Sequence, residues 1–141
     1  MKYKYKYKVG CSIENLKGVR DFIRVSLKNH HIPDLQISEI VLALDEMCSN
    51  LMIHAHQCKN EDLFEIIIHV ENNEPLVFEI IDDGTVFDIN DFSTPAIDNI
   101  IHEKRKGGLG IRLVKSIMDK VEYQKTSDHT ICRLVKTVRF K

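Results

Sequence analysis

One long apolar stripe limits how this chain can fold more than any other feature of its sequence. Its members recur at spacings of three and four residues, which predicts a single amphipathic helix from Asp34 to about His56, with Asp34 as the N-cap after Pro33. The stripe consists of Ile40, Leu44, Met47, Leu51 and Ala55. We expect the rest of the chain to be organised around this helix.

A second face of the same helix carries Glu46, Asn50 and His54, which recur every four residues. An acid, an amide and an imidazole in file could line a cleft. They could equally form the solvated side of an ordinary amphipathic helix. Taken alone, the helix favours the solvated side, because polar residues opposite a core stripe need no function.

The other segments alternate between the periods of strands and helices. Residues 2–9 alternate strictly between Lys and Tyr or Val, which predicts a strand with one face on a core and lysines along an exposed edge. The remaining predictions are a helix over 14–29, a hairpin of 63–70 and 76–82, a short helix around 97–101, a helix opening at 107–110, and closing strands over 121–125 and 130–138. This order predicts one α+β domain over residues 1–141, a two-layer sandwich of a mostly antiparallel sheet with helices on one face.

Composition narrows the class of protein. The chain has 141 residues, a hydrophobic share of 43% and a formal net charge of −1, as expected for one globular domain with no electrostatic reason to bind nucleic acid or a membrane surface. No apolar run approaches the roughly 20 residues that span a bilayer, and the N-terminus lacks the apolar region of a secretory signal. The four cysteines form no C-x-x-C pair, so we expect a cytoplasmic protein with free thiols.

Two further polar features fall at the ends of predicted elements. Asp82 is the last residue of a strand, and alternation places it on the same face as Phe78 and Ile80. Gly107-Gly108-Leu109-Gly110 stands just before a helix, where backbone N–H groups and the helix dipole favour a phosphate. This turn is neither a Rossmann fingerprint nor a Walker P-loop. By itself it is better explained as the flexible start of a helix.

The combination of these motifs is more specific than any one of them. In order they are Glu46-x-x-x-Asn50, Asp82-Asp83-Gly84 with Phe87-Asp88, Lys106-Gly107-Gly108-Leu109-Gly110-Ile111, and Met118-Asp119-x-Val121-x-Tyr123. Together they resemble the ATP-binding domain of the GHKL superfamily, which includes gyrase-type ATPases, heat-shock chaperones and histidine kinases. Within it, the sequence is most similar to bacterial anti-sigma-factor serine/threonine kinases, and the similarity covers nearly the whole chain.

The resemblance implies a role for each motif around ATP or ADP and Mg²⁺. Glu46 would take the proton from the attacking hydroxyl, and Asn50 would ligate Mg²⁺. Asp82 would accept a hydrogen bond from the adenine amino group, Gly84 would let the backbone turn beneath the base, and Thr130 would lie near adenine. The phosphates would be surrounded by Gly107, Gly108, Leu109 and Gly110, with residues 91–106 as the ATP lid.

Two positions depart from the family pattern. Gly84 is followed by Thr85 and Val86 without the second glycine of many relatives, and His129 precedes Thr130 where relatives often have glycine. Both lie at the rim of the expected nucleotide pocket. They bear on the expected affinity more than on the location of the site.

The resemblance implies an ATP- and Mg²⁺-dependent protein serine kinase that phosphorylates a small antagonist protein, binds a sigma factor and forms a homodimer, without direct contact with nucleic acid or a membrane. The alternative is a non-catalytic ATP-binding regulatory module that sequesters a protein partner, since such a descendant could keep every motif. A detached histidine-kinase catalytic domain is a third interpretation. The short lid and the absence of a phospho-acceptor helix pair count against it.

Overall fold

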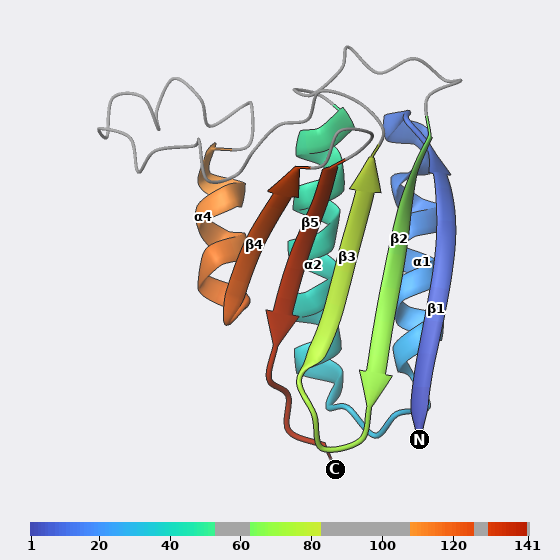
Figure 1. Cartoon of the computed structure of the whole chain (residues 1–141), viewed down its shortest axis with the longest axis vertical. Coiled ribbons are helices and arrows are strands. Elements are labelled where there is room, and N and C mark those ends of the chain that lie inside the picture. The colour runs from blue at the N-terminus through green and yellow to red at the C-terminus, as the bar shows by residue number, and fades with distance from the viewer. Residues whose placement is uncertain (53–62, 83–107, 126–129, 141) are drawn as a thin grey trace.

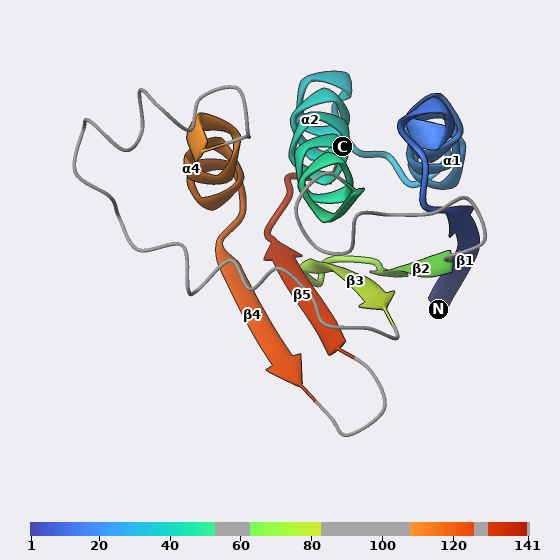
Figure 2. The ribbon, with the colours of Figure 1, turned by 90° about the horizontal axis from the view of Figure 1, so that it is seen from above.

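The structure is a computed structural model that describes residues 1–52, 63–82, 108–125 and 130–140. Within these residues the chain forms two layers, an antiparallel sheet and α-helices that cover one of its faces (Figures 1 and 2). The described elements are β1 (Lys2–Gly10), η1 (Ile13–Asn15), α1 (Leu16–Leu27), α2 (Asp34–Asn50), β2 (Leu63–Glu71), β3 (Leu76–Asp82), α4 (Gly108–Ile117), β4 (Lys120–Lys125) and β5 (Thr130–Lys136). The predicted α+β sandwich with helices on one face is confirmed.

The sheet has five strands in the order β1-β2-β3-β5-β4, and each neighbouring pair is antiparallel. β1 lies at an edge, as its alternating pattern predicted, with its four lysines exposed and Val9 buried. On the face opposite the lysines, Tyr7 stacks on Phe22 of α1 with ring centroids 4.9 Å apart. The aromatic side of β1 therefore packs against the first helix.

The core lies between the helices and the central strands. Phe78 of β3 and Leu134 of β5 face each other in register and are fully buried, as are Ile23 of α1 and Leu44 of α2. Burying one such side chain contributes about 1.5–3 kcal/mol to stability. The inward-facing side chains of the strands and the apolar stripe of α2 thus pack together in one core.

The start of α2 differs from the prediction. Pro33 is the N-cap residue, because its backbone is extended and its carbonyl oxygen already accepts a hydrogen bond from Ile37 N at 3.1 Å. Asp34 is the first helical residue, and no side chain caps the helix. The prediction of Asp34 as N-cap is therefore wrong, although an acid in the first turn suits the helix dipole.

Several predicted features lie outside the described residues. They are the continuation of the long helix from residue 53 to His56 with His54, the short helix at 97–101, the lid at 91–106, and the loop positions Gly84, Thr85, Val86, Gly107 and His129. None of the described helices is long and apolar enough to cross a membrane.

The cysteines only partly match the expected free thiols. Cys48 and Cys132 are buried thiols that form no disulfide, whereas Cys11 is disulfide-bonded, so the prediction is wrong for Cys11. Burial, and to a lesser degree the charge of Asp45, raises the pKa of the Cys48 thiol far above its usual value. Cys48 therefore behaves as an inert core residue rather than a reactive thiol.

Candidate functional site

The candidate site lies at one end of the two layers. The C-terminal ends of α2 and β3 and the N-terminal end of α4 all lie at this end (Figure 1). The end residues of these elements are Asn50, Asp82 and Gly108. Three of the predicted features are therefore brought to the same part of the fold.

Glu46 and Gly110 bring α2 and α4 into close contact. A Cβ added at Gly110 would lie 2.6 Å from Glu46 Cδ and would overlap the carboxylate. The absence of a Cβ lets the first turn of α4 approach Glu46 with its carboxylate in this position, and any larger residue would have to displace that carboxylate. The glycine-rich turn thus begins a helix that packs directly on the predicted base.

The environment of Glu46 favours its protonated form more than water does. Glu46 is half-buried, and burial is the main cause that raises the pKa of its carboxyl, followed by the negative charge of Asp45. Asp45 in turn forms an ion pair with Arg20 of α1, in which Arg20 Nη1 donates a hydrogen bond to Asp45 Oδ1 at 2.8 Å. A carboxylate with a raised pKa is a stronger proton acceptor, as a general base requires.

Asn50 lies one helical turn after Glu46 and is 1% exposed. Its Nδ2 donates to the main-chain oxygen of Glu46 at 2.7 Å, while its Oδ1 is buried and finds no donor among the described residues. An unsatisfied buried acceptor costs about 1–3 kcal/mol. A hard amide oxygen that no donor among the described residues satisfies fits a Mg²⁺ ion, which prefers oxygen ligands.

Asp82 and Thr130 form a pair in register at the end of β3 and the start of β5. They are 7% and 2% exposed, on the same face as the buried Phe78, so strand alternation correctly placed Asp82 beneath the helices. Thr130 Oγ1 donates to the main-chain oxygen of Asp82 over 3.4 Å. Asp82 is thus the polar end of a buried row on β3 that is otherwise apolar, and Thr130 begins the facing row on β5.

Some predicted site residues are not placed by the structure. Gly84 and Gly107 lie outside the described residues, and Leu109 is described only as part of helix α4. Gly108 is the first residue of that helix, so it lies where backbone N–H groups are not used within the helix. Their predicted roles stay predictions.

The structure adds two contacts that the sequence analysis missed. Lys136 is 8% exposed, and its Nζ donates to the oxygen of Ile117, the last residue of α4, at 2.9 Å. It holds the end of the helix whose start meets Glu46. The sequence contains a signal for the Lys136 contact, because a lysine at an inward position of an alternating strand is unusual. The Arg20–Asp45 pair joins residues 25 apart and has no local sequence signal.

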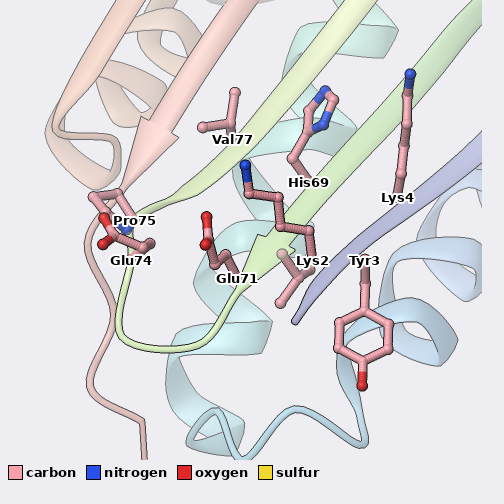
Figure 3. Close-up of a pocket in the computed structure, with 9 residues that line it drawn as sticks. Lys2, Tyr3, Lys4, His69, Glu71, Glu74, Pro75 and Val77 are labelled. Carbon is pink, nitrogen blue, oxygen red and sulfur yellow. The ribbon is translucent and has the colours of Figure 1, made fainter.

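A depression of about 410 Å³ lies elsewhere, beside the N-terminal end of β1 and the turn between β2 and β3 (Figure 3). Its lining residues are Lys2, Tyr3, Lys4, His69, Val70, Glu71, Glu74, Pro75 and Val77. It shares no residue with the site at Glu46, Asn50 and Asp82. It therefore does not belong to the candidate site.

Comparison with known proteins supports the fold. Residues 11–136 match the family described as the histidine kinase-like ATPase domain. Among curated proteins, the chain is similar to the serine-protein kinase RsbW of Bacillus pumilus, at 27% identity over 101 residues, 68% of this chain and 62% of that one. RsbW of Halalkalibacterium halodurans is 32% identical over 95 residues, 64% of this chain and 57% of that one. The chain thus spans less than two thirds of the length of these relatives.

Solved structures show the same fold at low identity. The RsbU and RsbW domains of Rv1364c from Mycobacterium tuberculosis match with a TM-score of 0.67 and 13% identity, covering 99% of this chain and 34% of that one. The SiaB–SiaC complex from Pseudomonas aeruginosa matches with a TM-score of 0.66 and 11% identity, covering 93% and 88%. At such identities the likeness concerns the fold alone.

Proposed function

Because this chain belongs to the histidine kinase-like ATPase domain family, we propose that it is an ATP- and Mg²⁺-dependent protein serine kinase of the anti-sigma-factor type. In this proposal residues 1–141 form one ATP-binding kinase domain. It phosphorylates a serine on a small antagonist protein in the cytoplasm, binds a sigma factor as its other partner, and acts as a homodimer. The similarity to proteins named serine-protein kinase RsbW supports the reaction type.

One observation carries the proposal. A half-buried carboxylate, Glu46, lies against a glycine of α4 and one turn from Asn50, whose buried Oδ1 has no donor among the described residues. A base with a raised pKa beside a hard oxygen that no described donor satisfies suits phosphoryl transfer, which uses a proton acceptor and a metal ion at the phosphates. A solvated helix face would need neither the close contact nor the buried amide.

The proposed roles follow from these positions. Asn50 Oδ1 would hold Mg²⁺, which when bound neutralises charge on the phosphates. The N-terminal N–H groups of α4 would bind phosphate oxygens, and the buried Asp82 carboxylate would accept a hydrogen bond from the adenine amino group.

In the transfer step, the Glu46 carboxylate takes the proton of the serine hydroxyl. The serine oxygen forms a bond to the γ-phosphorus, and the bond from that phosphorus to the β–γ bridging oxygen breaks. The products are phosphoserine and ADP, with the proton left on Glu46. No oxidant or further reactant is needed.

The test is incubation of the purified chain with labelled ATP, Mg²⁺ and the small candidate acceptor proteins of the same genome, followed by mass spectrometry of each acceptor. We expect a single phosphoserine, and no product when Mg²⁺ is chelated. Binding of ATP and of a protein partner without any transfer would instead identify the regulatory module.

A further inference from the structure

The outer face of α2 carries exposed apolar residues beside the proposed base. Leu42 lies one helical turn before Glu46 and is 46% exposed, although its neighbour Ala43 is fully buried. α2 is flanked on two sides, because Asp45 bonds Arg20 of α1 and Glu46 contacts α4. Helical spacing places Leu42 between these two sides, pointing away from the sheet.

A second exposed leucine comes from α4. The helices α2 and α4 run in opposite directions (Figures 1 and 2), so residues after Gly110 lie beside residues before Glu46. Leu113 is one turn after Gly110 and 37% exposed, and the next residue, Val114, is fully buried. Leu42 and Leu113 therefore flank the Glu46–Gly110 contact on its outer side. Single exposed leucines are ordinary, but two from different helices at one carboxylate form a local apolar surface.

The charge of this surface is negative. Glu39 lies two turns before Glu46 on the same side of α2 and is half-exposed. The exposed cations of α4, Arg112 and Lys115, fall on the side of that helix away from Gly110 by helical spacing. We call the surface made by Glu39, Leu42, Glu46, Gly110 and Leu113 the acceptor strip.

We propose that the acceptor strip docks the serine-bearing segment of the protein acceptor, which seats an apolar side chain between Leu42 and Leu113 and a Lys or Arg side chain at Glu39. This inference rests on the proposed kinase function. A base must come within about 3 Å of the hydroxyl it deprotonates, so the acceptor segment has to pass beside Glu46. The strip is the described surface that continues from that carboxylate along both helices.

Charge and burial select the chemistry of this segment. The carboxylates of Glu39 and Glu46, together with a bound triphosphate, repel an acidic segment and favour a basic one. Covering Leu42 and Leu113 removes apolar surface from water, which favours an apolar side chain in the segment. The preferred acceptor sequence thus combines a basic and an apolar residue on one side of the serine.

The experiment uses a library of synthetic peptides with one fixed serine, in which each flanking position is in turn Lys, Glu, Leu or Gly. Wild-type protein with ATP and Mg²⁺ should favour Lys and Leu at two positions on one side of the serine. Leu42→Ser and Leu113→Ser should each lower kcat/KM for the Leu-containing peptides by about tenfold and should abolish the preference for Leu. Glu39→Gln should remove the preference for Lys while leaving that for Leu.

The matched control is Val25→Ser, because Val25 is also an exposed apolar helical residue, 64% exposed, but lies on α1. It should change no preference, and all variants should keep wild-type ATP affinity and melting temperature. Transfer by wild type without sequence preference, or preferences that survive in the strip variants, would overturn the docking proposal alone. Absence of transfer to every peptide and every acceptor protein would overturn the kinase proposal, and the strip with it.

Discussion

Among the described residues, two helical glycines are approached closely, but by different kinds of side chain. A Cβ at Gly18 of α1 would lie 2.5 Å from the hydroxyl oxygen of Tyr7, and a Cβ at Gly110 would lie 2.6 Å from Cδ of Glu46. The Tyr7 ring stacks on Phe22, so that contact is part of the packing between β1 and α1. At Gly110 the neighbour is a carboxylate with a raised pKa, beside the buried Asn50.

The two contacts can be told apart by experiment, because only the one at Gly110 involves a residue with a proposed catalytic role. The hydroxyl of Tyr7 is the far end of an aromatic side chain, and a small shift of that end relieves a clash. The Glu46 carboxylate has to stay where it is if it serves as a base, because a misplacement of about 1 Å can cost 10²-fold in rate. A Cβ added at Gly18 and one added at Gly110 would be similarly crowded, but only the one at Gly110 should lower the rate of phosphoryl transfer.

The largest expected effect tests whether the α2–α4 contact is functional at all. Glu46→Gln keeps the size of the side chain and removes the proton acceptor, so phosphoryl transfer should fall by about 10²-fold or more while ATP affinity stays within a few-fold. A single-turnover transfer assay and a separate ATP titration measure the two quantities. Transfer at the wild-type rate would mean that Glu46 only solvates the helix and that both glycines are packing positions.

The direct test of the comparison pairs Gly110→Ala with Gly18→Ala. Both changes gain up to about 1 kcal/mol of helix propensity, so any loss reflects the new Cβ. At Gly110 the Cβ displaces the Glu46 carboxylate, and transfer should fall by up to about 10²-fold. At Gly18 transfer should be unchanged and stability should shift by no more than about 1–3 kcal/mol. A comparable loss of transfer in both variants would contradict the distinction.

A smaller effect is expected from Asn50→Ala, which removes the buried Oδ1 that no described donor satisfies. Wild-type protein should bind ATP more tightly with Mg²⁺ than without it. In the variant, this gain in affinity should be smaller by about tenfold. Calorimetric titration of ATP with and without Mg²⁺ measures it. The thermal stability should change little, since the substitution removes both a hydrogen bond to Glu46 and an unsatisfied acceptor. An unaltered Mg²⁺ dependence would rule out the ligand role.

Local patterns predicted the elements and some of the site. The alternation of β3 correctly put Asp82 with Phe78 on the buried face, because strand geometry relates neighbours in sequence directly. The contact between Glu46 and Gly110 joins residues 64 positions apart on two helices, and no period in the sequence encodes how closely two helices pack. Family resemblance, rather than periodicity, linked these motifs before their proximity was known.

The N-cap of α2 and the thiol of Cys11 show a second limit. Asp is a preferred N-cap residue, but the carbonyl oxygen of Pro33 already accepts the first hydrogen bond of the helix. The backbone at Pro33, and not the residue type of Asp34, therefore determines where the helix begins. Cys11 is disulfide-bonded although the spacing of the cysteines indicated no pair. Sequence spacing does not give the distance between residues that the fold brings together.

The smallest expected effect concerns the pKa of Glu46 and comes from Asp45→Asn. Burial is the larger cause of the raised pKa and remains in the variant, whereas the negative charge of Asp45 is removed. The pKa of Glu46 should therefore move part of the way back towards its ordinary value. Because the base acts when deprotonated, the acidic limb of the transfer rate should shift to lower pH, by less than about one pH unit.

The same shift should be visible in stability, with a definite sign. A carboxyl whose pKa is raised by folding contributes stability below its unfolded pKa and loses it as pH rises through the folded pKa. Relative to its own value at low pH, the Asp45→Asn protein should thus lose less stability near pH 7 than wild type does.

Arg20→Gln is the matched control, since it breaks the same 2.8 Å ion pair but keeps the charge of Asp45. It should lower the melting temperature slightly, as expected for a partly exposed pair worth up to about 1 kcal/mol, without moving the acidic limb to lower pH. An identical downward shift in both variants would show that loss of the pair, rather than loss of the charge next to Glu46, changes the base.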